Sequence, residues 1–427
     1  MPLDLRSRRC ESIRVGVRLA LAETIWGTVM RGMRALLFGL AVGIAAPAVS
    51  LAESSQFHAG PDRSGVFPGP GPDGFYQLLW RFDAGHMVVA SPIVADGVLY
   101  AGAKNGKFYA LDARSGALKW TFTADAPITS SAAIADGICY FTTNANTVYA
   151  LKTSDGSLAW KKVTGPDLPF DAMAGFHMSQ DWDYWTSSPL ALGNRIYVGS
   201  GDGKVYALDT KSGDVVWSYA TTGRVRSSPA SDGHTIFAGS FDGEMVALDV
   251  HSGKPRWTFH TLGTPVFPAG SIQSSPAVKD GLVFFGARDF NLYALDAGTG
   301  RDVWHQSVKN SWVPSTPAVA DGRIYVGSAD GRALFAFESK TGKQLWTTPL
   351  DNLIFSSPVI AGDGVYIATL GGTVFGVKAA SGQVFSYTLT QDRVLSTPWI
   401  ENAILYFGDN DGFIYAFGSG PKKFPGG

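Results

Sequence analysis

The chain has 427 residues and a formal net charge of −1, with 51 glycines, 12% aromatic residues and only 17% charged residues. This balance excludes a strongly basic surface, so we expect no nucleic acid among its partners. Abundant glycine and aromatic residues with few charges are typical of short strands joined by tight turns, and they favour an internally repeated β fold.

Residues 1–52 have the layout of an export leader. Two arginines precede an apolar run from Ala35 to Val49, and small residues follow up to Ala52, the expected cleavage site. The apolar run is too short to span a bilayer, so we expect no transmembrane segment in the mature chain. The residues before Met30 are unusual for a signal peptide and indicate a start codon assigned too early. The leader predicts a periplasmic or secreted protein.

A repeat fills the remainder of the chain. Its outermost marker is an aromatic residue, and successive markers are 40, 40, 57, 40, 47, 42 and 39 residues apart: Trp80, Trp120, Trp160, Trp217, Trp257, Trp304, Trp346 and Phe385. Within each unit, four runs of strand-forming residues are separated by Asp-Gly or Ser/Thr-Gly, which are hairpin signals. Four antiparallel strands recurring at this period predict a propeller blade, because one such sheet must stack on its neighbours to bury both faces.

Eight units predict an all-β, eight-bladed propeller over residues 75–418, after an N-terminal extension (53–74) and before a flexible tail (419–427). The eighth unit ends at Phe417 after three strands, whereas a lone strand from Phe75 to Phe82 precedes the first unit. We expect this N-terminal strand to complete the last blade and remove an exposed sheet edge. The tryptophan markers are expected to dock between blades.

Two insertions interrupt the repeat, and strand parity places both on one face of the ring, here called the elaborated face. The passage from the tryptophan marker to the next inner strand takes 28 residues from Trp160 to Ser188 and 18 from Trp257 to Ser275, against 11 or 12 in most units. Long loops are uncommon unless they are functional, so we predict a ligand site on this face. The alternative is a loop that packs on itself as a lid over the channel.

Residues just before each inner strand should line a funnel at this face. Arg224 and Arg226 lie two apart on a strand, so both side chains point the same way and are able to clamp a carboxylate. The alternative is an ion pair between Arg226 and an acid of the chain itself. The full set of candidate ligand-binding or cofactor-binding residues is Tyr184, Trp185, Arg224, Arg226, Gln273, Arg288 and Trp312.

Acidic residues divide into two groups. Those that recur with the repeat, such as Asp112 and Asp209, are expected to cap turns. Asp289 is the candidate catalytic acid, and the larger insertion holds three acids that suit a hard cation: Asp171, Asp181 and Asp183. The seven histidines lack ligand spacing, so no metal site follows from them.

The motif Tyr-Ala-Leu-Asp-x-x-Ser/Thr-Gly-x-x-x-Trp is clear at Tyr109 to Trp120, Tyr206 to Trp217 and Tyr293 to Trp304. It resembles the repeat of dehydrogenases that depend on pyrroloquinoline quinone (PQQ), and it also occurs in the BamB-like, non-catalytic propellers of outer-membrane barrel assembly. The resemblance therefore specifies the fold more closely than the chemistry.

Three functions follow from this resemblance. The favoured one is a binding or scaffold module whose partner is a periplasmic or cell-envelope protein or a small anionic ligand, although the lipidation cysteine of BamB-like proteins has no counterpart after Ala52. The alternative is a quinoprotein oxidoreductase. In that case PQQ would stack on Trp185 or Trp312, Arg226 would hold its carboxylates, calcium would polarise its carbonyl and Asp289 would be the base. The adjacent cysteine pair of those enzymes is missing here. A hydrolase of the tetrathionate hydrolase type is the third.

Overall fold

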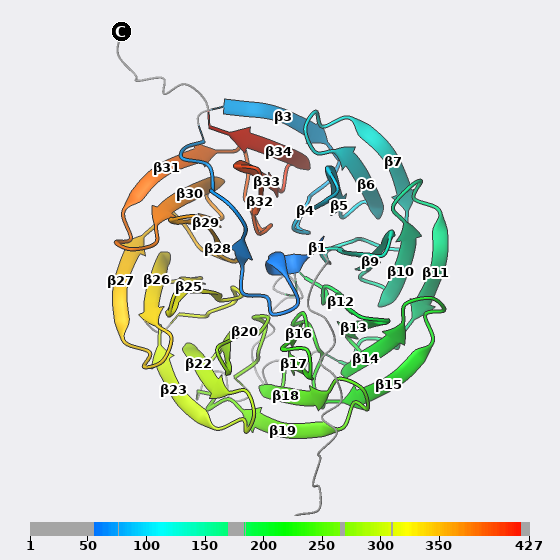
Figure 1. The fold of residues 1–427 in the computed structure, drawn as a ribbon, viewed down its shortest axis with the longest axis vertical. Coiled ribbons are helices and arrows are strands. Elements are labelled where there is room, and N and C mark those ends of the chain that lie inside the picture. Colours follow the sequence, from blue (N-terminus) through cyan, green and yellow to red (C-terminus); the bar gives the residue numbers. More distant parts are fainter. Residues whose placement is uncertain are drawn as a thin grey trace, which may run out of the picture. The chain divides into compact units, whose positions relative to one another are not determined.

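The structure, a computed structural model, describes residues 55–75, 77–169, 183, 185–264, 270–308 and 311–419. These residues form eight four-stranded antiparallel sheets arranged as the blades of a ring (Figure 1). This confirms the predicted eight-bladed propeller. Among the described residues, no helix is both long and apolar enough to cross a membrane.

The first four blades run from the axis outward. Their strands are β4 (Ile93–Ala95), β5 (Val98–Gly102), β6 (Lys107–Asp112) and β7 (Leu118–Thr123); β8 (Ala133–Ala135), β9 (Ile138–Thr142), β10 (Thr147–Lys152) and β11 (Leu158–Val163); β12 (Leu190–Leu192), β13 (Arg195–Gly199), β14 (Lys204–Asp209) and β15 (Val215–Ala220); and β16 (Ala230–Ser231), β17 (Thr235–Gly239), β18 (Glu244–Asp249) and β19 (Pro255–His260).

The last four blades follow the same order. Their strands are β20 (Ala277–Lys279), β21 (Leu282–Gly286), β22 (Asn291–Asp296) and β23 (Asp302–Ser307); β24 (Ala318–Ala320), β25 (Arg323–Ser328), β26 (Ala333–Glu338) and β27 (Gln344–Pro349); β28 (Val359–Ala361), β29 (Gly364–Ala368), β30 (Thr373–Lys378) and β31 (Val384–Leu389); and β32 (Trp399–Glu401), β33 (Ile404–Gly408), β34 (Phe413–Gly418) and β3 (Gln77–Asp83).

The core lies between neighbouring blades. The middle strands are almost wholly buried, whereas outer strands such as β7 alternate between exposed and half-buried residues. This difference arises because both faces of a middle strand contact an adjacent blade. Phe108 on β6, for example, stacks on Phe141 on β9 of the next blade, with ring centroids 4.3 Å apart. The alternating aromatic and aliphatic residues of the repeat therefore form a continuous ring of interblade contacts.

The N-terminal strand closes the ring, as the sequence predicts. β3 pairs with β34 in an antiparallel register that places Trp80 opposite Ala416. Figure 1 shows β3 on the outside of the blade formed by the C-terminal strands. The first and last segments of the propeller thus share one sheet, and β34 has no free edge.

Each tryptophan marker docks on the Ser/Thr-Gly turn of the next blade. Trp120 donates its indole N–H to the carbonyl of Thr153 at 2.9 Å, and its ring covers Gly156, where an added Cβ would lie 2.6 Å from the ring. Equivalent hydrogen bonds are made by Trp80, Trp160, Trp217, Trp257, Trp304 and Trp346. Phe385 is the exception in the repeat for a structural reason. The blade that follows it takes its fourth strand from the N-terminus, so it has no such turn to accept an indole N–H.

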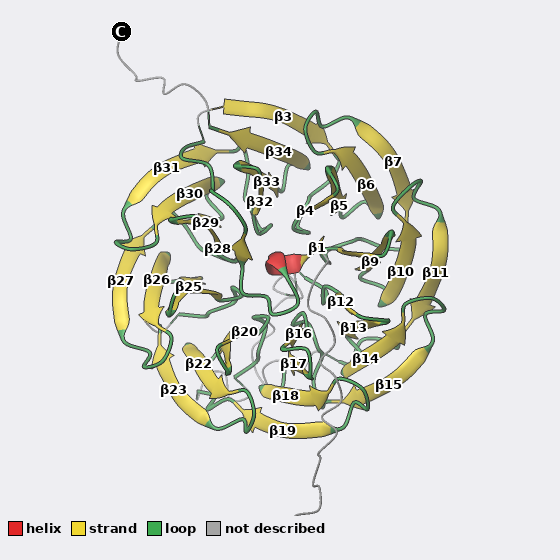
Figure 2. Cartoon of the chain, viewed as in Figure 1, coloured by secondary structure: helices red, strands yellow, loops and turns green. Residues whose placement is uncertain are grey.

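The segment from Ser55 to Phe67, here called the plug, fills the centre of the ring. It contains β1 (Ser55–Gln56), a short 3₁₀ helix (Phe57–Ala59) and β2 (Val66–Phe67). Figure 2 shows the helix on the axis, encircled by the inner strands. β1 pairs with β8 and β2 pairs with β28. The residue pattern of this extension predicts none of these elements.

Further main-chain bonds tie the plug to the blades between β8 and β28. Inner-strand N–H groups donate at 2.7 to 2.8 Å to the plug carbonyls of Pro61, Asp62, Ser64 and Gly65. The plug is therefore held mainly through its backbone, by hydrogen bonds of the kind that join strands in a sheet.

Two buried plug side chains strengthen this attachment. The Arg63 guanidinium donates to the carbonyls of Pro229 and Phe57 at 2.6 Å, and burial lowers its pKa to about 9. The His58 ring lies between the carbonyls of Arg63 and Pro358, 2.5 and 2.8 Å from its nitrogens. Burial lowers the pKa of His58 to about 4, so its neutral form is favoured.

Candidate functional site

A narrow cavity of about 50 Å³ lies on the axis of the ring. Phe57 of the plug forms its floor. Its opposite end, at the elaborated face, is lined by Trp185, Arg226, Gln273, Pro314, Phe355 and Leu395. Because the plug occupies the other end of the channel, a ligand reaches this cavity from the elaborated face.

A belt of hydroxyl groups lines the middle of the cavity. At the start of the inner strands, a backbone N–H donates to the Ser or Thr hydroxyl of the next blade, as from Ser131 to Ser188 at 2.9 Å and from Thr397 to Ser91 at 2.8 Å. The same bond joins Ser91, Ser188, Ser228, Thr316 and Ser357 to their neighbours. These hydroxyls recur with the repeat, and their visible role is to join blades.

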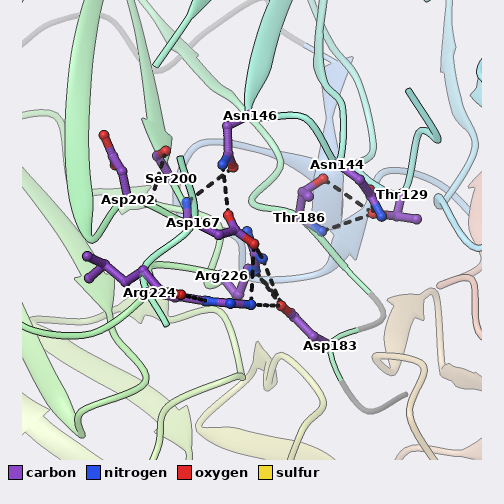
Figure 3. Close-up of polar contacts among 12 residues, drawn as sticks. Thr129, Asn144, Asn146, Asp167, Asp183, Thr186, Ser200, Asp202, Arg224 and Arg226 are labelled. Carbon is purple, nitrogen blue, oxygen red and sulfur yellow. Dashed lines mark hydrogen bonds and ion pairs between the residues drawn. The ribbon is translucent and has the colours of Figure 1, made fainter. Parts of the chain in front are cut away.

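Arg224 and Arg226 point the same way, as their spacing predicts, but they hold carboxylates of the chain itself. Figure 3 shows both guanidinium groups beside Asp167 and Asp183, which come from the larger insertion. Arg226 binds Asp183 through Nε and Nη2, at 2.9 and 2.7 Å from Oδ2, and Asp167 at 2.7 Å. Arg224 lies 3.1 Å from Asp183. This arrangement agrees with the alternative prediction, an ion pair between Arg226 and an acid of the chain itself.

The four charges of this ion-pair cluster stabilise one another. Burial favours neutral Asp167, but Arg226, the Asn146 amide and Arg224 outweigh it and lower the pKa of Asp167. Burial likewise opposes the charge on Arg226, yet Asp183 and Asp167 raise its pKa. Both shifts favour the charged forms of Asp167 and Arg226, so this ion pair is kept near neutral pH.

Arg288 is a third arginine beside this cluster, and its environment differs. It lies in the turn between β21 and β22, is only 3% exposed, and stacks over the rings of Trp312 at 4.8 Å and Phe241 at 5.6 Å. Its Nη2 donates to Gln273 Oε1 at 3.2 Å, and its buried Nε has no hydrogen-bond partner among the described residues. Burial lowers the pKa of Arg288 to about 10, against the attraction of Asp183.

Within the part of the chain that the structure describes, Arg288 makes no ion pair. The sequence names Arg288 as a candidate, but it does not reveal that this charge lacks an acid.

Asp289, the candidate catalytic acid, is engaged in its own turn. Its carboxylate accepts hydrogen bonds from the Tyr293 hydroxyl and from the backbone N–H groups of Gly263 and Asn291. Asp202 accepts the Tyr206 hydroxyl at 2.6 Å in the corresponding turn of another blade. These contacts are those of a turn cap, and the catalytic role of Asp289 stays a prediction.

Apolar residues form a collar around part of the funnel. Its buried members are Val89, Ala329, Phe355 and Leu395, and its half-buried members are Met87, Trp185, Trp312, Leu353 and Leu370. Trp185 packs against Phe355 with ring centroids 6.1 Å apart. The predicted site residues Trp185, Gln273 and Trp312 are therefore gathered at one mouth, whereas Tyr184, Asp171 and Asp181 lie outside the described residues.

Some of the residues that the sequence offers for a quinone and calcium already have partners within the chain. Arg226, the candidate for the quinone's carboxylates, is ion-paired with Asp167 and Asp183, as is Arg224, and these bonds withdraw the two acids from a cation as well. No group of three or more His, Cys, Asp or Glu side chains suited to a metal ion occurs in the described ranges. The free Cys139 is buried, and burial raises its pKa well above the ordinary value.

Comparisons with known proteins agree with the geometry of the ring. A family model described as outer membrane protein assembly factor BamB matches residues 76–258, 174–309 and 267–412. The solved structure of BamB from Moraxella catarrhalis is 21% identical with a TM-score of 0.65, covering 82% of this chain and 99% of that one. A europium-containing methanol dehydrogenase is 15% identical with a TM-score of 0.69, covering 83% and 90%. At these identities the two structures establish the fold alone.

One curated relative matches a smaller part. Tetrathionate hydrolase from Acidithiobacillus ferrooxidans is 28% identical over an alignment of 134 residues, with 25% of this chain and 27% of that protein covered. The match thus spans about a quarter of that relative's length.

Proposed function

Since the chain belongs to the family of outer membrane protein assembly factor BamB, we propose that it is a non-catalytic binding module of the periplasm or cell envelope. Its funnel holds a segment of a partner protein. The observation that carries this proposal is the pairing of two surfaces at the mouth of one cavity. The apolar collar adjoins a polar set of Arg226, Gln273 and Arg288, and the two surfaces meet where Arg288 stacks on Trp312.

Such a mouth has the composition of a protein-binding hot spot. Aromatic residues and arginine contribute most binding energy at interfaces, and the most effective contacts are those shielded from water. Trp185, Trp312 and Phe355 supply the aromatic surface, and all three are at least half-buried within the funnel. The acids near the funnel are already bonded to arginines or to their own turn, which favours a role in binding over one in proton transfer.

The test is capture of a partner from a cell-envelope extract. We expect the double variant Trp185→Ala/Phe355→Ala to capture at least about tenfold less partner than the wild type, because it lacks two aromatic anchors. The matched control is Tyr387→Ala/Leu389→Ala, which removes two apolar side chains from the exposed outer strand β31. Unchanged capture by the funnel variant contradicts the proposal, provided that both variants melt at the wild-type temperature.

A second measurement separates binding from quinone chemistry. Wild-type protein is titrated with PQQ and Ca²⁺ while its absorbance spectrum is recorded. Under the proposed function, the spectrum of each mixture equals the sum of the spectra of protein and PQQ, with no saturable change. A saturable change, lost in Trp185→Ala/Phe355→Ala, would favour a quinoprotein oxidoreductase instead.

A further inference from the structure

We propose that the funnel contains a carboxylate subsite at Arg288 and that its ligand is the carboxyl-terminal end of an apolar segment of the partner. This inference rests on the proposed function, because it assumes that the funnel binds polypeptide. It assigns the group that the funnel recognises, which neither the family nor the similar structures provide.

The charge of Arg288 is the first argument. Arg288 makes no ion pair with an acid that the structure describes, whereas Arg226 is paired with both Asp167 and Asp183. A buried guanidinium without an acid is rare, because desolvation disfavours the charged form. Arg288 is buried in this way, with only 3% of its surface exposed, and one bound carboxylate would neutralise its charge.

The hydrogen-bonding edge of Arg288 is the second argument. A guanidinium holds a carboxylate with two parallel bonds, and Arg226 does so on Asp183, with Nε donating to Oδ1 at 3.0 Å and Nη2 lying 2.7 Å from Oδ2. The same edge of Arg288 is only half used. Its Nη2 donates to Gln273 Oε1 at 3.2 Å, while its Nε has no partner among the described residues. A neutral amide oxygen thus occupies half of an edge that suits a carboxylate. Gln273 also lines the cavity, so its side chain separates Arg288 from the incoming ligand.

The surroundings of Arg288 define the rest of the ligand. Trp312 stacks on the guanidinium and is also a member of the apolar collar, so the group attached to the carboxylate meets an apolar surface. The floor formed by Phe57 prevents a polypeptide from passing through the channel. A chain end satisfies both conditions, because its carboxylate is the last group and its final side chain contacts the collar.

The test compares two peptides that differ only at this group. A peptide with an amino-terminal fluorophore and the sequence Gly-Ser-Gly-Leu-Val-Phe is prepared as the free acid and as the carboxyl-terminal amide. Affinities for the full mature protein are measured by fluorescence anisotropy. We expect the acid to bind about tenfold more tightly than the amide, which is the usual effect of a charged hydrogen bond.

Two variants probe the subsite without enlarging the cavity. Arg288→Met removes the charge and keeps an unbranched side chain, and Gln273→Glu places a carboxylate of the protein on Arg288. Both are expected to bring the acid to the affinity of the amide. Arg81→Met is the control, because Arg81 lies on the exposed strand β3 and stacks on Phe413. It should leave the tenfold preference unchanged.

Each remaining outcome is informative. Equal affinity of acid and amide for the wild-type protein overturns the subsite and leaves the binding module standing. Failure of both peptides to bind, together with unchanged partner capture by Trp185→Ala/Phe355→Ala, overturns both proposals. If 3-phenylpropionic acid alone binds as tightly as the peptide acid, the ligand is a small apolar acid, and the assignment to a polypeptide end is wrong.

Discussion

Replacing Arg288 with methionine should stabilise the propeller while it removes the preference for a carboxylate. Burial lowers the pKa of Arg288 from 12.5 to about 10, which corresponds to about 3 kcal/mol of unfavourable charge burial. Stacking on Trp312 and Phe241 offsets about 2 kcal/mol of this in a desolvated setting. Methionine keeps most of the apolar stem and is flexible enough to fill the space. We therefore expect a gain of about 1 kcal/mol in the free energy of unfolding.

The measurement is urea unfolding at pH 7. The urea concentration at the midpoint is compared between the variant and the wild type, provided that the slope of the free energy against urea concentration is the same for both. The matched control is Arg226→Met. It leaves Asp183 and Asp167 with one cation fewer, so we expect a loss of about 3 kcal/mol. A loss of 2 kcal/mol or more in Arg288→Met would refute the reasoning, because Arg288 would then be a structural residue with a strong partner.

Three further predictions concern the ring. Deletion of all residues up to Asp83 removes both the plug and β3, so the product should be insoluble; a soluble truncation that melts cooperatively would disprove closure by this strand. His58 has its pKa lowered from 6.5 to about 4, so its contribution is complete above pH 6.5 and is lost as the pH falls toward 4, by about 3 kcal/mol. Unfolding experiments at pH 7 and pH 4 should show this loss in the wild type and not in His58→Gln, and equal losses would contradict it. Gly156→Ala should destabilise the protein by about 2 kcal/mol more than Gly97→Ala, since both glycines have positive φ but only Gly156 is covered by Trp120. Thermal melting of the two variants measures the difference. Equal melting temperatures would show that the Trp120 ring moves to admit the methyl group with no loss of stability.

The features that follow the period of the sequence are the ones that sequence reasoning predicts well. The blade count, the closing strand and the docking of Trp120 and its equivalents all repeat, so each copy supports the others. Even the exception at Phe385 has a structural cause, because the next blade lacks the turn on which a tryptophan would dock. The plug does not repeat, and it binds largely through main-chain carbonyls, which any sequence provides. The residue pattern therefore does not predict that the plug lies on the axis.

The site follows the same division. The common direction of Arg224 and Arg226 follows from strand geometry and is predictable. Their partners are not, because Asp167 and Asp183 come from an insertion whose path has no counterpart in other blades. Arg288 was identifiable as a cation near the rim, whereas its lack of an acid depends on how several loops meet around it.

The most direct test of the funnel as a binding site is a site-specific cross-link in intact cells. A photoreactive phenylalanine analogue replaces Phe355 in the collar or, as control, Tyr387 on the exposed outer strand β31. We expect a specific cross-link to a partner polypeptide from position 355, mapping near the partner's carboxyl terminus, and none from position 387. A partner that cross-links only from position 387 would contradict the assignment of the funnel.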